Sequence, residues 1–194
     1  GAMHNWHYRS SSTMALSATI YRFGIDLSDM NRHIYERVSL HVALHPSETI
    51  ERMCARLVAF ALSYEEHLEF TKGLSTDDEP DIWKVNYSSE IEHWIEIGKP
   101  DAKRLKKALG RSKKVSVFSY GGQDVEQWIE SIMKDASVNQ KISAFRFDKE
   151  PVEQFASLVE RTMELGIMIQ DDLIHVSFDG NMIEFKLETL MGHL

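Results

Sequence analysis

The sequence has few of the features that mark secreted, membrane-embedded or disulfide-stabilised proteins. Cys54 is the only cysteine among the 194 residues, so no intrachain disulfide can form. The longest apolar run, Leu57 to Leu62, is far shorter than the roughly 20 residues that a bilayer-spanning helix needs. We therefore expect a cytoplasmic protein without a membrane-embedded segment, in which Cys54 is a small core residue rather than a nucleophile.

The N-terminus lacks the long apolar segment of a signal peptide. Residues 1–13 contain a serine run, Ser10 to Ser12, and are expected to be a vector-derived remnant or a disordered lead-in. The natural start is then Met14. The remaining residues, 14–194, are enough for one domain with a sizeable core and too few for two, so a single domain is expected.

An excess of positive charge is also missing. The formal net charge is -8, and the field of such a protein repels phosphate on average. A general nucleic-acid-coating role is therefore excluded. Any contact with nucleic acid must come from a local basic surface.

Hydrophobic periodicity and turn signals predict an α/β (α+β) fold, with a mixed central sheet, flanking helices and a β-hairpin at each end of the chain. The predicted elements are an N-terminal hairpin over residues 14–27 and 34–44, a helix over 47–66, strands at 81–86 and 91–97, a helix over 100–109, a strand at 115–120, a helix at 128–134, a strand at 144–147, a helix at 151–164, a strand at 167–170, and a C-terminal hairpin over 174–178 and 182–187.

Two carboxylates stand out on neighbouring predicted strands. Asp81 lies near the start of one strand and Glu96 near the end of the next, so pairing of the strands as a hairpin brings the two together. Carboxylate oxygens are the ligands that Mg²⁺ and Mn²⁺ prefer, and phosphodiester hydrolysis commonly uses such an ion. Helical projection also places Glu51 beside the apolar stripe of the first helix, where it could face the same site.

Basic residues concentrate directly after Glu96. The stretch 99–114 holds eight of the 22 lysines and arginines of the chain. On the predicted helix 100–109, Lys103 and Lys107 point outward, whereas Arg104 and Lys106 flank the buried stripe, so that Lys106 can lean toward Glu96. This helix, continued by Arg111, is the expected contact surface for nucleic acid.

Glu96 has two competing interpretations. Strand alternation places Trp94, Glu96 and Gly98 on one face and Ile95 and Ile97 on the other, so the carboxylate sits among apolar neighbours and needs a partner. One interpretation is a metal ion. The other, equally weighted, is a structural ion pair with a nearby lysine or arginine.

From Met14 to the C-terminus, this chain resembles the bacterial YaeQ family in several short motifs. They are His45-Pro46-Ser47-Glu48-Thr49, Glu51-Arg52-Met53, Phe70-Thr71, Gly73-Leu74, Asp77-Asp78-Glu79-Pro80, Trp94-Ile95-Glu96, Gly98, Pro100-Asp101 and Lys106-Lys107-Ala108. The resemblance implies a variation of the PD-(D/E)XK, restriction-endonuclease-like core. It further implies that Asp81 and Glu96 form the acidic pair, with Glu51 as a candidate third acid.

The same resemblance exposes a departure at position 98. A nuclease of this type carries a lysine two residues after the second acid, and here that residue is Gly98. Lys106 or Lys99 would have to serve instead, contacting the scissile phosphate or activating water.

Two functional hypotheses follow. The first is a metal-dependent nuclease-like protein in which Asp81 and Glu96 hold Mg²⁺ or Mn²⁺. The second is a non-catalytic module that binds nucleic acid or protein and retains a degenerate nuclease core, which the glycine at position 98 favours. The sequence does not specify DNA or RNA, nor the oligomeric state.

Overall fold

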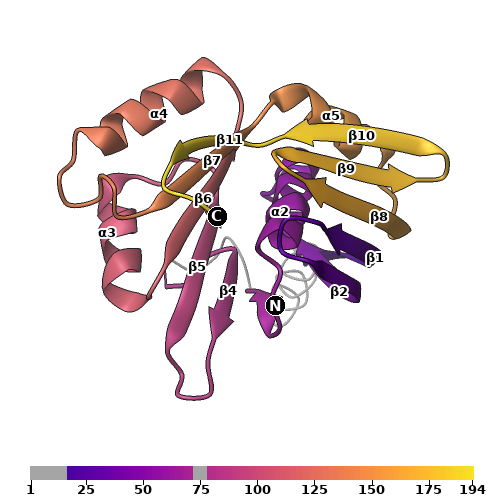
Figure 1. Cartoon of the computed structure of the whole chain (residues 1–194), viewed down its shortest axis with the longest axis horizontal. Coiled ribbons are helices and arrows are strands. Elements are labelled where there is room, and N and C mark those ends of the chain that lie inside the picture. Colours follow the sequence, from indigo (N-terminus) through magenta and orange to yellow (C-terminus); the bar gives the residue numbers. More distant parts are fainter. Residues whose placement is uncertain (1–16, 72–77) are drawn as a thin grey trace, which may run out of the picture.

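Two mixed β-sheets enclose helix α2 in the computed structural model, which describes residues 17–71 and 78–194 (Figure 1). The strands are β1 (Thr19–Asp29), β2 (Ile34–Leu44), β3 (Leu68–Phe70), β4 (Ile82–Val85), β5 (Ile91–Ile97), β6 (Val115–Tyr120), β7 (Ser143–Phe147), β8 (Thr162–Gln170), β9 (Leu173–Phe178), β10 (Asn181–Lys186) and β11 (Glu188–Met191). The helices are α2 (Ile50–Ser63), α3 (Ala102–Arg111), α4 (Gln123–Met133) and α5 (Lys149–Leu158).

The first sheet, called the hairpin sheet, joins the two ends of the chain. Its strand order is β10-β9-β8-β1-β2, with β1 antiparallel to β2 and parallel to β8. Its inner face is apolar because alternate residues of each strand point inward, as Phe23, Ile25 and Leu27 do on β1. The predicted N- and C-terminal hairpins are both confirmed, and they belong to one sheet.

The second sheet, called the central sheet, has the order β11-β7-β6-β5-β4-β3. Strands β5, β6 and β7 run parallel, whereas β4 pairs antiparallel with β5. The carboxyl ends of the three parallel strands therefore lie along one edge, which is where ligands bind in open α/β sheets.

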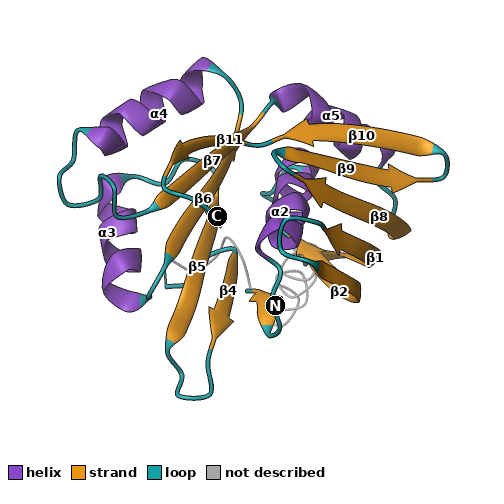
Figure 2. Cartoon of the chain, viewed as in Figure 1, coloured by secondary structure: helices purple, strands orange, loops and turns teal. Residues whose placement is uncertain are grey.

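The two faces of the central sheet are covered by different helices (Figure 2). Ile95 and Ile97 of β5 pack with α2 and the hairpin sheet, whereas Trp94 packs with α3 and α4 on the other face. Glu96 shares the face of Trp94, as strand alternation predicts. Helix α3 therefore borders the face of the sheet that contains Glu96, and α2 covers the opposite face.

The predicted fold class is confirmed, although β3 and β11 were not predicted and some other elements differ in detail. The central sheet is present as expected, but the two hairpins join β8 in a second sheet. The predicted helix 151–164 ends at Leu158, and residues 162–164 already belong to β8, because Met163 and Leu165 alternate into the core of the hairpin sheet. No helix within residues 17–71 and 78–194 is long and apolar enough to cross a membrane.

Candidate functional site

Asp81 and Glu96 are brought together by the β4–β5 hairpin. Ile82 pairs with Ile95, so continuing this register by one residue sets Asp81 opposite Glu96. Both are buried, with 6% and 4% of their surface exposed. Burial raises the pKa of Glu96, and the negative charge of Asp81 adds to that rise. The two carboxylates are thus close enough to repel each other.

The Asp81 carboxylate is held by Arg52 of α2 and by the backbone. Its oxygens Oδ1 and Oδ2 lie 2.9 and 3.0 Å from Nη2 of Arg52. Oδ2 also accepts a hydrogen bond of 2.8 Å from the N–H group of Ile97. Asp81 therefore connects the start of β4 to the end of β5 and to α2.

Arg52 serves a second carboxylate as well. Its Nη1 donates to Glu48 at 2.7 Å, and its Nη2 donates to the carbonyl of Ile97 at 3.0 Å. Burial lowers the pKa of Arg52, but the charges and hydrogen bonds of Asp81 and Glu48 outweigh that effect and raise it above the usual arginine value. The guanidinium is therefore charged at every physiological pH.

Glu48 is shared with a further arginine, Arg56, which is itself buried. Nη2 of Arg56 lies 2.7 Å from Oε1 of Glu48, and the same nitrogen donates to the carbonyl of Ala43 at 2.9 Å. The guanidinium also lies 5.3 Å from the ring centroid of Phe70. Glu48 and Arg56 were not among the predicted site residues, although an arginine inside the apolar run of α2 is the signal that could have revealed them.

Glu96 is held from the other face of the sheet. Its Oε1 accepts hydrogen bonds from Nε1 of Trp94 at 2.8 Å and from Nε of Arg104 at 2.7 Å. These donors act against the rise in the pKa of Glu96 that burial produces. The ion-pair interpretation of Glu96 thus describes the observed contact, and the partner is Arg104 of α3.

The predicted lysines lie away from this carboxylate pair. Lys106 is exposed, and its charge helps to lower the pKa of Asp135, although hydrogen bonds from Ser137 lower that pKa more. Lys99 pairs with Asp124 at 2.7 Å. The place beside Glu96 that the sequence assigned to Lys106 is occupied by Arg104.

Gly98 could not simply be exchanged for a lysine in this backbone. Its φ angle is +119°, a conformation that residues with a Cβ atom rarely adopt. Its N–H group donates to the carbonyl of Phe118 at 3.0 Å, which fixes the end of β5 against β6. The missing lysine is therefore tied to the local backbone conformation.

Glu51, the third predicted acid, is half-buried on the first turn of α2. It lies near Cys54, whose pKa rises to about 12, mainly through burial and then through the charges of Glu51 and Glu48. Cys54 is buried, as predicted, and remains a thiol at neutral pH. No group of three or more His, Cys, Asp or Glu side chains within residues 17–71 and 78–194 is arranged to hold a metal ion.

A divalent cation does not fit the carboxylate pair in the observed arrangement. The carboxylates of Asp81, Glu96 and Glu48 are matched by the guanidinium groups of Arg52, Arg56 and Arg104, so three negative charges face three positive ones. A metal ion would have to displace guanidinium groups that already satisfy the carboxylate oxygens.

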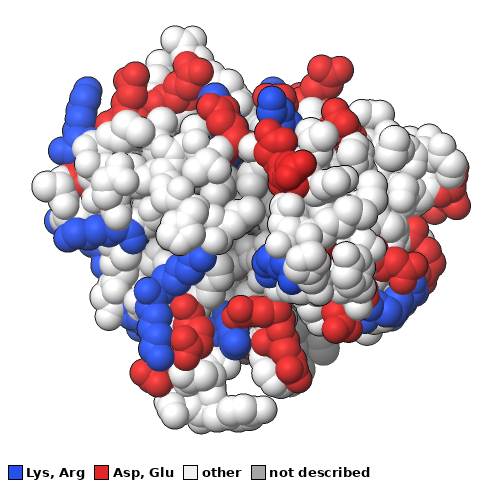
Figure 3. Space-filling model, in the orientation of Figure 1, with Lys and Arg blue, Asp and Glu red and all other residues white. Residues whose placement is uncertain are grey.

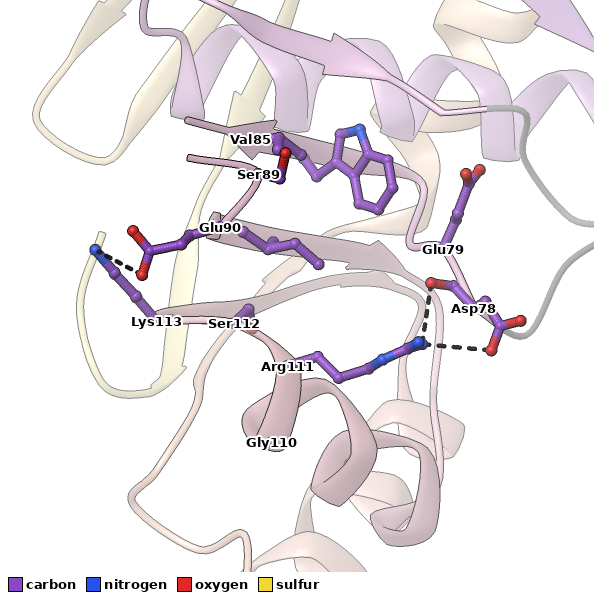
Figure 4. A pocket seen from close by; sticks show the side chains of 11 residues that line it. Asp78, Glu79, Val85, Ser89, Glu90, Gly110, Arg111, Ser112 and Lys113 are labelled. Atoms are coloured by element: carbon purple, nitrogen blue, oxygen red, sulfur yellow. Dashed lines mark hydrogen bonds and ion pairs between the residues drawn. The ribbon is translucent and has the colours of Figure 1, made fainter. Parts of the chain in front are cut away.

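The predicted nucleic-acid surface on α3 is partly engaged by the protein itself. Lys107 lies 3.0 Å and Arg111 3.3 Å from Oδ1 of Asp78, while Lys103 is exposed. Arg111, Asp78 and Glu79 help to line a pocket of about 690 Å³, and Figure 4 shows Arg111 reaching Asp78 there. On the face drawn in Figure 3, basic and acidic side chains alternate along the lower part of the molecule.

Replacing Arg52 by methionine tests how much the buried network stabilises the fold. The substitution leaves Glu48 and Asp81 buried with fewer partners, so Arg52→Met should lower the free energy of unfolding by about 3–5 kcal/mol. Urea denaturation followed by circular dichroism measures this loss. The matched control is Arg37→Met, since Arg37 also bridges two carboxylates, Asp26 and Glu164, but at the surface. The control should lose much less, and equal losses would contradict a special role for burial.

The pH dependence of stability tests the state of Glu96. A carboxyl group whose pKa is raised in the folded state contributes stability at low pH that disappears as the pH rises through the folded pKa. The difference in unfolding free energy between the parent and Glu96→Gln should therefore fall as the pH rises from the ordinary glutamate pKa toward neutrality. Denaturation curves from pH 4 to 7 measure it, and a difference that grows with pH would show that Arg104 dominates over burial.

This chain is similar in sequence and in structure to known proteins. The family model described as YaeQ protein matches residues 14–187. The uncharacterized protein YaeQ of Escherichia coli K12 is 38% identical over 174 residues, which cover 90% of this chain and 96% of that protein. Its counterpart from Salmonella typhi is 37% identical with the same coverage.

Solved structures give the same result. The crystal structure of YaeQ protein from Xanthomonas axonopodis pv. citri superposes with a TM-score of 0.86 at 36% identity, covering 91% of this chain and all of that one. YaeQ protein from Pseudomonas syringae gives a TM-score of 0.83 at 34% identity, covering 91% of this chain and 97% of that one. The chain belongs to the YaeQ protein family.

Proposed function

We propose that this protein is a non-catalytic nucleic-acid-binding module that keeps the frame of a PD-(D/E)XK nuclease core. The observation that carries the proposal is the balance of charge at the predicted catalytic position. Asp81 and Glu96 come from adjacent strands, as nuclease acids do, but each binds an arginine. An electrically balanced, hydrogen-bonded site has little attraction for Mg²⁺ or Mn²⁺.

The position of the basic groups supports binding in place of cleavage. A catalytic lysine has to reach the phosphate that the metal-bound acids activate. Lys99 pairs with Asp124, and the cations that pair with Asp81 and Glu96 are the arginines Arg52 and Arg104. The exposed lysines of α3 can still contact phosphates, because such contacts need charge and access but no catalytic alignment.

Helix α3 is a suitable local surface on an acidic protein. Lys103, Lys106 and Lys107 are exposed on it, and Arg111 extends the row at its C-terminal end. Lys107 and Arg111 have Asp78 as their internal partner, and that surface ion pair is weak enough to exchange for a phosphate. Arg104 is assigned a structural role, since it holds Glu96 and the carbonyl of Glu79.

Fluorescence anisotropy with labelled single- and double-stranded DNA and RNA tests the binding. Affinity should fall with salt, and Lys103→Glu or Lys107→Glu should lower the slope of log K against log salt by about one unit. Lys186→Glu, the same exchange on the exposed part of β10, should bind like the parent. A chelator should change nothing. Absence of binding, or equal effects of all three variants, would refute the role of α3.

A second candidate, a metal-dependent phosphodiesterase, is favoured by one specific observation. Glu79 has a buried carboxylate oxygen, Oε2, that makes no hydrogen bond within the part of the chain that the structure describes. A nearby cation would stabilise this buried oxygen. It would also favour the ionised form of Glu96, whose pKa is raised. Cleavage that requires Mn²⁺ and disappears in Glu96→Ala would support this candidate over the non-catalytic one.

A further inference from the structure

A second polar pocket lies at the carboxyl ends of the parallel strands. It has a volume of about 440 Å³ and is bordered by the residues that follow β5 and β6, namely Gly98, Lys99 and Gly121, together with Tyr120 at the end of β6. Arg52 separates it from the Asp81 carboxylate. The pocket is distinct from the basic outer face of α3.

Three cationic side chains from three separate segments line this pocket. They are Arg52 from α2, Lys99 from the β5–α3 connection and Lys149 from the first turn of α5. Among the described residues, the one acidic side chain in the lining is Asp124, whose pKa is lowered chiefly by its hydrogen bond with Lys99. The charge of Arg52 is already matched by Asp81 and Glu48, so the cations that can exchange their partners for a ligand are the exposed Lys99 and Lys149.

The positive charge comes from side chains of three separate segments. Asp124 lies in the first turn of α4, and its carboxylate accepts a hydrogen bond of 2.7 Å from Nζ of Lys99. Lys149 is the most accessible of the cations, with 69% of its side chain exposed and a surface partner, Glu153, at 3.5 Å. Such a loose exposed pair yields readily to a ligand with a higher charge.

The backbone leaves room where side chains would otherwise fill the space. A Cβ atom built at Gly98 or at Gly122 meets no heavy atom within 4 Å. The two glycines therefore present open main chain to the pocket. Tyr120 adds a half-buried aromatic ring to the wall, which suits a flat or apolar group attached to an anion.

We propose that this pocket binds a phosphate monoester. Such a group carries nearly two negative charges at neutral pH and can pair with both exposed lysines, Lys99 and Lys149, whereas a carboxylate carries one. The pocket lies in the size range of small-molecule sites, so it accommodates the phosphate together with a ring-bearing group against Tyr120. The ester is either a free mononucleotide-sized molecule or the 5′ end of a nucleic acid.

Isothermal titration with adenosine 5′-monophosphate, inorganic phosphate and adenosine tests the proposal. The monophosphate should bind most tightly, phosphate more weakly and adenosine not detectably. Lys149→Gln should weaken monophosphate binding about tenfold, as loss of one of two exposed cations does. Lys141→Gln is the matched control, since Lys141 is exposed near the opposite end of β7. Equal binding by parent and Lys149→Gln, or equal binding of adenosine and its monophosphate, would overturn the proposal.

Further experiments identify the source of the ester and distinguish this pocket from the surface of α3. A 5′-phosphorylated oligonucleotide is compared with the same oligonucleotide that ends in a 5′-hydroxyl group. If the phosphorylated form binds at least as tightly as the monophosphate and the hydroxyl form binds more weakly, the pocket recognises nucleic-acid ends. If neither oligonucleotide binds in the pocket but the monophosphate does, the ligand of the pocket is a free ester. Lys103→Glu should leave monophosphate binding unchanged, so failure of α3 as a nucleic-acid surface is distinguishable from failure of this pocket. Loss of monophosphate binding in Lys103→Glu would contradict a separate pocket.

Discussion

The contact of Arg52 with two buried carboxylates is the interaction on which the candidate site depends. Through Glu48 and Asp81, and through the carbonyl of Ile97, it joins α2 to both strands of the β4–β5 hairpin. Burying these charges costs free energy, and the cost is offset only while every partner is present. Helix α2, which covers the face of the sheet opposite Glu96, therefore fixes the position of Asp81 relative to Glu96.

A second arginine completes the arrangement from the near side. Arg104 holds Glu96 and, through the carbonyl of Glu79, the segment that leads into β4. The acidic pair is thus enclosed between two guanidinium groups contributed by α2 and α3. The proposed binding of anions therefore falls to other cations, which lie on α3 and in the pocket beside Gly98 and are exposed.

Much of the fold could be predicted from periodicity, because the buried residues of strands such as β9 and β10 alternate with more exposed ones. Local register also sufficed to place Asp81 near Glu96 and Trp94 on the same face as Glu96. The identity of the partners could not be predicted in this way. Arg52 reaches Asp81 from 29 residues away, and helical projection alone does not distinguish Arg104 from Lys106 as the residue beside Glu96. Likewise, residues 162–164 continue the amphipathic pattern of α5, yet pairing with β1 makes them a strand.

The central claim is that arginines, and not a metal ion, compensate Asp81 and Glu96. Diffraction from crystals soaked in MnCl₂, recorded at a wavelength where manganese scatters anomalously, tests it most directly. The account predicts no anomalous peak between the two carboxylates and intact contacts from Arg52 and Arg104. A manganese peak there, with either guanidinium displaced, would contradict it.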